Sequence, residues 1–165
     1  MYSCNVIPPG TVRRVIADLQ PALAPFERRR RPPSLLVKRL PDDRPARLRE
    51  RLRTAVRGTS PVEARITGIG CFEDPPAGPG PVVYLAVESS GLARIHRQLC
   101  GYFDVVPGLE GDGYVPHVTL ARDGPADAVA RLVDRSVDPV SWTVSALHLY
   151  DAAARESMWR IPLPA

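Results

Sequence analysis

The chain of 165 residues is poor in cysteine and has no long apolar stretch. Cys4, Cys71 and Cys100 are widely spaced and form no CxxC pair, so the sequence predicts neither a disulfide framework nor a zinc site. No apolar run approaches the roughly 20 residues that a membrane helix needs. The first residues have no basic start and no long apolar core, so we expect a strand there rather than a signal peptide. These absences favour a cytoplasmic protein without membrane contact.

Common catalytic signatures are missing as well. The sequence contains no Walker phosphate loop, no GxGxxG, no GxSxG and no HExxH. Its His, Cys, Asp and Glu residues show no metal-ligand spacing, so we expect no metal and no cofactor. The net charge of +4 is carried largely by arginine. Such a charge suits a polyanion such as RNA, and a GC-rich genome explains it equally well.

Hydrophobic periodicity divides the chain into two similar series of elements. The first comprises a strand over 2–7, a helix from 11, a strand over 35–40, a helix from about 45 and a strand over 62–72. The second comprises a strand over 82–88, a helix over 91–99, a strand at 117–122, a helix over 127–135 and strands near 142–150 and 158–163. This order predicts an α+β fold, with residues 1–165 forming one domain of two pseudo-symmetric lobes.

A segment of the second series echoes one of the first. Residues 116–122, PHVTLAR, read against residues 33–39, PSLLVKR, and each follows the first helix of its series. The echo fails where Ser34 stands opposite His117. Because side chains alternate along a strand, His117 and Thr119 point to one face. An imidazole and a hydroxyl on one face can hold a phosphate and move a proton.

The His-x-Thr strand resembles the signature of the two-histidine (2H) phosphoesterases, which include the 2′-5′ RNA ligases and RNA cyclic phosphodiesterases. That family has two His-x-Thr-x strands, one in each lobe. His117–Leu120 resembles the second, whereas Ser34–Val37 stands where the first is expected and is degenerate, with Leu36 in place of threonine. The resemblance extends to the strand over 82–88, the helix over 91–99 and the strand around Leu147. It implies a bilobal, duplicated fold in which antiparallel sheets line a central cleft and helices lie outside.

The resemblance also implies a mechanism. In such a phosphoesterase one histidine removes a proton from the attacking oxygen and the other protonates the leaving oxygen, without a metal. His117 and Thr119 are then the catalytic residues of this chain. Ser34 cannot titrate near neutrality, so catalysis is expected to be weakened or altered, and activity as a phosphoric diester hydrolase stays open. The implied partner is RNA or a nucleotide phosphoester, bound by a monomer.

Four residues are candidates for holding substrate: Ser34, Lys38, Tyr114 and Arg122. Lys38 lies four residues after Ser34, so we expect it on the same face, either as a charge or proton donor in the site or as a solvent-facing strand residue. Tyr114 is placed to stack on a base or to pack on its loop. By the same alternation, Arg39 and Arg122 lie on the opposite face, where they reach the cleft rim or pair with acids outside.

The other two histidines and one arginine run have weaker claims to function. His96 shares its helix with an apolar stripe and is expected to be structural, and His148 lies away from both motifs. Arg28–Arg31 is predicted to be a solvated loop, with an RNA clamp as the alternative because the run precedes the first motif.

Three functions are compatible with these residues. The first is a phosphoesterase acting on a 2′,3′-cyclic phosphate or a 2′-5′ phosphodiester of RNA or a nucleotide. The second is a binding module that holds RNA or a nucleotide without turnover. The third is an enzyme of the same fold repurposed for a specialised small substrate, with Lys38 or Ser34 in a new role.

Overall fold

The computed structural model describes residues 1–164, which form four α-helices and one nine-stranded sheet. The strands are β1 (Tyr2–Val6), β2 (Arg28–Arg29), β3 (Leu35–Leu40), β4 (Val62–Phe72), β5 (Val82–Glu88), β6 (His117–Arg122), β7 (Val140–Val144), β8 (Ala146–Asp151) and β9 (Glu156–Pro162). The helices are α1 (Gly10–Leu19), α2 (Pro45–Ala55), α3 (Ser90–Cys100) and α4 (Ala126–Val133). Neighbouring strands follow the order β7-β4-β5-β6-β3-β1-β8-β9, with β2 paired to β6.

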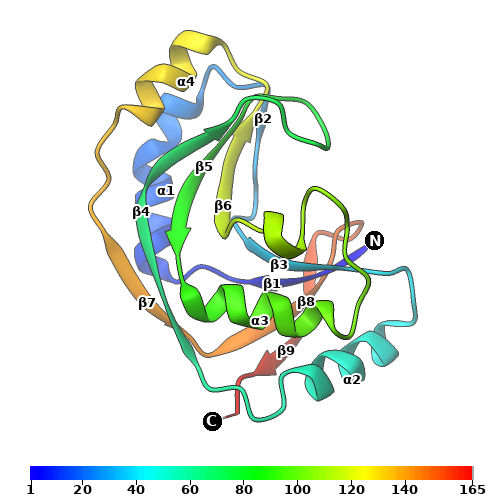
Figure 1. The fold of residues 1–165 in the computed structure, drawn as a ribbon. Helices are drawn as coiled ribbons and strands as arrows, with labels where there is room; N and C mark the ends of the chain where they lie inside the picture. The colour runs from blue at the N-terminus through cyan, green and yellow to red at the C-terminus, as the bar shows by residue number, and fades with distance from the viewer. Residues whose placement is uncertain (165) are drawn as a thin grey trace.

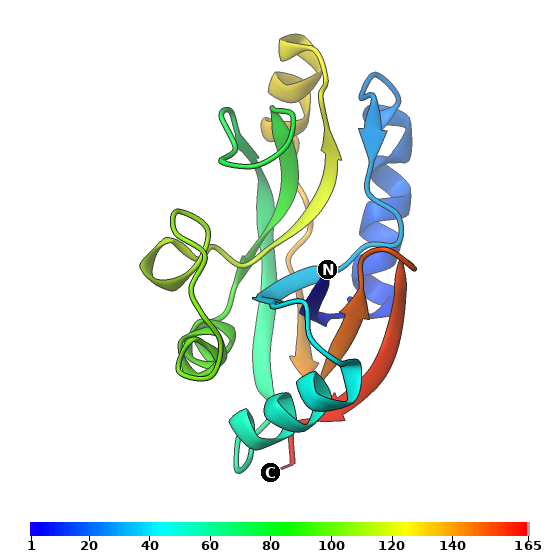
Figure 2. The ribbon, with the colours of Figure 1, turned by 90° about the vertical axis from the view of Figure 1, so that its right-hand side faces the viewer.

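The sheet consists of two antiparallel groups of strands, and each group contains strands from both halves of the chain. β4 follows α2 in sequence but pairs with β5, and β8 follows α4 but pairs with β1. The groups β7-β4-β5-β6 and β3-β1-β8-β9 meet where Leu35 of β3 pairs with Val118 of β6. Figure 2 shows the first group on one side, β8 and β9 on the other, and β1 and β3 between them. The predicted α+β fold with antiparallel sheets is confirmed, and its lobes are built from both halves.

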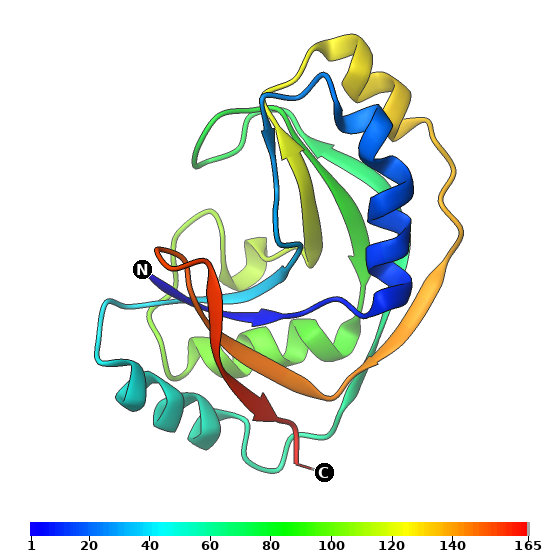
Figure 3. The same cartoon turned by 180° about the vertical axis from the view of Figure 1, so that it is seen from behind.

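The helices lie around the outside of the sheet, as expected (Figures 1 and 3). α3 is representative: Leu92, Ile95 and Leu99 recur at helical spacing and are fully buried. Each contributes about 1.5–3 kcal/mol of burial free energy. The side chain of Ser89 begins the helix by accepting the N–H of Leu92 at 3.1 Å. Within residues 1–164, no helix has both the length and the apolar character needed to span a bilayer.

Two sequence expectations about the elements were wrong. The strand predicted near 142–150 is two strands, because the chain crosses at Ser145 from β7, which pairs with β4, to β8, which pairs with β1. Apolar residues continue on both sides of Ser145, so the sequence gives no sign of this crossing. Arg28 and Arg29, predicted as loop, form β2 against β6.

The two echoed strands each contain one extra residue at matching positions. The pairing of β3 with β1 skips Val37, and the pairing of β6 with β5 skips Leu120. These two residues stand opposite each other when the echoed segments are aligned. An extra residue of this kind is a β-bulge, and beyond it the alternation of side chains is shifted by one.

The bulges reverse three predicted side-chain orientations. Lys38, expected beside Ser34, points into the core and is completely buried. Arg39 and Arg122, expected on the opposite face, line the same cavity as Ser34 and His117. The predictions were wrong because they counted strict alternation through a strand that contains an extra residue.

A buried ion pair ties the bulged part of β3 to the loop before β6. Nζ of Lys38 lies 2.5 Å from Oε2 of Glu110, and the two side chains are 0% and 1% exposed. Nζ also donates to the carbonyls of Arg39 and Asp104, while Glu110 accepts the N–H groups of Arg39 and Val106. Burial opposes ionisation of Glu110, but the bonds from Lys38 and these two N–H groups lower its pKa below the usual value. The carboxylate therefore stays charged within the core.

His96 and Tyr114 bind the backbone carbonyls at the bulge. Nδ1 of His96 donates to the carbonyl of Val37 at 2.7 Å, and Nε2 accepts the N–H of Gly111 at 2.8 Å. The hydroxyl of Tyr114 donates to the carbonyl of Leu36 at 2.9 Å, and the two rings stack with centroids 3.9 Å apart. Burial lowers the pKa of His96, which favours the neutral imidazole that this bonding requires. Its predicted structural role is confirmed.

We expect Glu110→Gln to lower the free energy of unfolding by about 3–5 kcal/mol, because it leaves the charge of Lys38 buried without a partner. Urea denaturation followed by circular dichroism measures this change.

The matched control is the double variant Lys38→Met, Glu110→Gln, which removes both charges. It should be more stable than Glu110→Gln alone. A loss below about 1 kcal/mol in the single variant would show that the buried pair does not hold the bulge and the loop together.

Candidate phosphoester site

Three adjoining cavities form a cleft along the face shared by β3 and β6. The central cavity, about 230 Å³, is lined by both echoed strands. An apolar cavity of about 180 Å³ adjoins it on one side, and an arginine-rich cavity of about 320 Å³ adjoins it on the other. Arg122 borders all three cavities. The cleft is therefore continuous, with different chemistry in each part.

His117 lines both the central and the apolar cavity, and within residues 1–164 only its Nδ1 forms a hydrogen bond. Its Nδ1 lies 2.7 Å from the carbonyl oxygen of Val115, which can only accept, so Nδ1 carries the proton and Nε2 keeps its lone pair. Burial lowers the pKa of His117 below its usual value; the bond to Val115 opposes this, and the charges of Arg39 and Arg122 lower the pKa further. The imidazole is thus neutral near pH 7 and able to accept a proton.

Two aromatic rings hold the imidazole in place. The ring centroids of Phe72 and Tyr84 each lie 5.2 Å from that of His117, edge to face, and the two rings stack on each other at 4.2 Å. Tyr84 fits against β4 because its cross-strand partner is Gly70, where a Cβ atom would come within 2.6 Å of the ring. The glycine thus permits the packing that orients the histidine.

Ser34, the residue just before β3, lines the central cavity. Its hydroxyl accepts a hydrogen bond from Nη2 of Arg30 at 3.2 Å and a long one from Nδ2 of Asn5 at 3.5 Å. Asn5 is only 2% exposed, and its Oδ1 has no hydrogen-bond partner within residues 1–164. Unsatisfied buried polar atoms are rare, so Asn5 stands out among the residues around Ser34.

Arginines crowd the cleft, and among those that line it within residues 1–164 only Arg39 has an acidic partner, Oε1 of Glu110 at 3.9 Å. Nη1 of Arg122 donates to the carbonyls of Ala77 at 3.0 Å and Pro79 at 3.4 Å, so the loop between β4 and β5 fixes its position. Burial lowers the pKa of Arg122 the most, and the positive charges of Arg30 and Arg39 lower it further. These like charges repel one another, and an anion in the cleft would relieve that repulsion.

The structure brings together most of the residues proposed from the sequence. His117, Thr119, Ser34 and Arg122 all line the central cavity. Tyr114 lines the apolar cavity instead, with its ring stacked on His96. Lys38 lines none of the three cavities, because its side chain is in the core with Glu110. In residues 1–164, no group of three or more His, Cys, Asp or Glu side chains is arranged to hold a metal ion.

Sequence reasoning did not name Asn5, Tyr150 or Arg155 as residues of the cleft. It placed Arg39 at the cleft rim or outside, and it considered Arg30 only within the run Arg28–Arg31 as an alternative RNA clamp. Two signals were present. Each echoed segment ends in an arginine, and the structure places these two residues, Arg39 and Arg122, together at the cleft. Asn5 is a polar residue in a short, otherwise buried strand end. Nothing in the sequence indicated that β8 and the turn after it reach the cleft.

Comparisons with known proteins agree with this geometry. The family model of the 2′-5′ RNA ligase superfamily matches residues 8–156. TT0787 of Thermus thermophilus has a similar structure, with a TM-score of 0.69 and 22% identity over 98% of this chain and 97% of that one. Apo E. coli LigT matches with a TM-score of 0.65 and 17% identity over 99% and 97% of the two chains. LigT complexed with 3′-AMP matches with a TM-score of 0.64 and 18% identity over 99% and 98%.

Among curated proteins, none matches the chain by sequence. The structural neighbours share the fold at low identity, while the family model covers nearly the whole chain and both echoed strands. The chain belongs to the 2′-5′ RNA ligase superfamily, and its fold is that of the 2H phosphoesterases.

Proposed function

We propose that the central cavity binds a phosphoester of RNA or a nucleotide, and that the protein slowly hydrolyses a 2′,3′-cyclic phosphate or a 2′-5′ phosphodiester there. The observation that carries the proposal is that the bond to Val115 leaves Nε2 of His117 without a proton, and that His117 lines a cavity with Thr119, Arg39 and Arg122. A neutral imidazole beside guanidinium groups can take a proton from water and hold an anion at the same place.

His117 acts as the general base in this proposal. Nε2 removes a proton from a water molecule whose oxygen attacks the phosphorus, and one ester P–O bond breaks as the new P–O bond forms. Arg39 and Arg122 stabilise the negative charge on the phosphoryl oxygens, and the hydroxyl of Thr119 donates a hydrogen bond to one of them. A cyclic phosphate opens to a phosphate monoester.

The leaving oxygen lacks a strong proton donor. Ser34 stands where the resemblance places a second histidine, and its hydroxyl does not titrate near neutrality. Lys38 does not replace that histidine, because its ammonium group is buried against Glu110. The leaving oxygen then takes its proton from water, which slows the reaction by about 10²–10⁴-fold relative to a positioned acid.

The adjoining apolar cavity supports a nucleotide as ligand. It lies directly beside His117 and includes Phe72, Leu109 and Tyr114, which offer flat or apolar surface to a base. The E. coli protein of similar fold is known as a complex with 3′-AMP. A nucleotide whose 3′-phosphate lies in the central cavity can place its base in the adjoining apolar cavity.

We expect Ser34→His with Leu36→Thr to raise the hydrolysis of 2′,3′-cyclic AMP by about a hundredfold over the wild type. The histidine restores a proton donor, and the threonine replaces an apolar side chain that lines the cavity. Chromatographic assay of the monophosphate product measures the rates.

His117→Ala is the control that should abolish turnover in both backgrounds. A wild type that already turns over about once per second or faster would contradict the proposal, because an unidentified group would then supply the second proton transfer.

The pH dependence of kcat/KM should have a single limb. It rises with pH as His117 loses its proton, with a midpoint below about 6.5 because the pKa of His117 is lowered, and it is flat above. The double variant should instead give a bell-shaped profile, since it needs one protonated and one neutral imidazole. A wild-type rate that falls between about pH 6 and 8 would make His117 an acid and refute its role as base.

A binding module without turnover is the second candidate. It is favoured by Ser34 itself, whose hydroxyl is held by Arg30 and Asn5 and contributes no acid–base group. Calorimetry with 3′-AMP separates the two candidates. Binding that His117→Ala weakens, together with no product formation above the His117→Ala background, would assign the binding module.

A further inference from the structure

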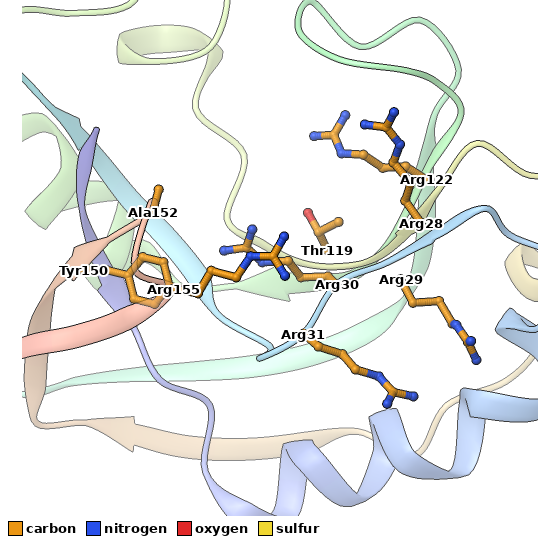
Figure 4. A pocket seen from close by; sticks show the side chains of 9 residues that line it. All are labelled: Arg28, Arg29, Arg30, Arg31, Thr119, Arg122, Tyr150, Ala152 and Arg155. Atoms are coloured by element: carbon orange, nitrogen blue, oxygen red, sulfur yellow. The ribbon is translucent and has the colours of Figure 1, made fainter.

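The arginine-rich cavity next to the central one carries more positive charge than a single phosphate requires. Its volume is about 320 Å³, and its lining includes Arg28, Arg30, Arg122 and Arg155. Arg28 and Arg122 are cross-strand partners in β2 and β6. In Figure 4 their side chains extend together, while Arg30 and Arg155 extend toward the part of the cavity near Thr119. These arginines come from three separate segments of the chain.

Alternation within the run Arg28–Arg31 separates the residues that face the cleft from those that do not. Arg29 and Arg31 border the cavity, but Figure 4 shows their guanidinium groups extending the other way, toward α1. Arg31 donates to Oε1 of Gln20 at 3.0 Å on that side. The run is therefore neither a uniform clamp nor a free loop, because half of its charge is directed into the cleft.

The charge in this cavity is not neutralised by the protein. None of the lining residues is acidic. No carboxylate within residues 1–164 forms an ion pair with any of the four arginines. Glu27 and Glu156 are adjacent in sequence to the cluster but do not line the cavity. Holding several like charges together without a counter-charge costs free energy, which a bound anion would return.

The turn that carries Arg155 holds it in an uncommon backbone conformation. Arg155 has a φ of 56°, a left-handed value that is unfavourable for a residue with a side chain. Oδ1 of Asp151 fixes the start of the turn by accepting the N–H groups of Ala153 at 2.8 Å and Ala154 at 3.3 Å. The turn thus places one more guanidinium group at the cleft, at the cost of local backbone strain.

We propose that this cavity binds a second phosphate group of the same ligand, which is either the next phosphodiester of an RNA chain or a further phosphate on the nucleotide. The proposal rests on the proposed function, because it assigns the phosphate at His117 to the central cavity. Guanidinium groups match phosphate oxygens in geometry and charge, and Thr119, Arg122 and Tyr150 line both cavities and join them. A nucleotide with one phosphate at His117 leaves the arginine-rich cavity without an anion.

Calorimetry on the full chain tests this with three ligands: 3′-AMP, adenosine 3′,5′-bisphosphate and a 3′-phosphorylated ApA dinucleotide. At least one two-phosphate ligand should bind about tenfold or more tightly than 3′-AMP, because its second phosphate adds charge-assisted hydrogen bonds to the arginines. Arg28→Gln and Arg155→Gln should each bring this affinity ratio close to one. Arg29→Gln removes the same charge from the same strand but from the other face, so it should keep the wild-type ratio.

The ligands distinguish the two sources of the second phosphate. An equal gain for both two-phosphate ligands supports a phosphate on the nucleotide itself, and a gain for the dinucleotide alone supports an RNA chain. The proposal is overturned if neither binds more tightly than 3′-AMP, or if Arg29→Gln lowers the ratio as much as Arg28→Gln does. Failure of the proposed function would give a different result. His117→Ala would then leave the affinity for 3′-AMP unchanged, while the affinity ratio between the two-phosphate ligands and 3′-AMP would still test the role of the arginines.

Discussion

The cleft exists because β3 and β6 each contain one extra residue and because a buried ion pair holds the first of these irregularities in place. The bulges at Val37 and Leu120 turn Arg39 and Arg122 toward the cleft. In β3 the same shift sends Lys38 into the core, where only a fully bonded carboxylate makes its burial tolerable. Glu110 supplies that carboxylate from the loop that leads to the His117 strand. The buried ion pair in the core therefore also determines the position of the strands that line the site.

The electrostatics of the cleft follow from this construction. Arginines from β2, β3, β6 and the β8–β9 turn face the cavities. Glu110, buried in the core, pairs closely with Lys38 and at 3.9 Å with Arg39. Burial and the surrounding positive charge keep His117 neutral. The result is an uncharged proton acceptor in a strongly cationic pocket, an arrangement suited to a phosphoester whose attacking group must lose a proton.

The sequence predicted most elements, the α+β fold and the residues of the His117 strand, because these depend on local periodicity and on a short motif. It did not predict which way Lys38, Arg39 and Arg122 point, because a bulge is set by tertiary bonds such as that from His96 to the carbonyl of Val37. It also did not predict that Arg155 reaches the cleft, since that depends on β8 crossing to pair with β1. Features that depend on contacts between distant segments, the bulges within β3 and β6 included, could not be predicted from the sequence.

The most direct test of a phosphate bound at a neutral His117 is the titration of the histidine ring protons by NMR, with and without saturating 3′-AMP. The chain has only three histidines, and they lie in different environments. We expect the pKa of His117 to be below about 6.5 in the free protein and to rise by about one pH unit or more with ligand, because a nearby anion stabilises the protonated ring. The pKa of His96, which is bonded at both nitrogens inside the protein, should not change. An unchanged titration of His117 in the saturated complex would contradict the account.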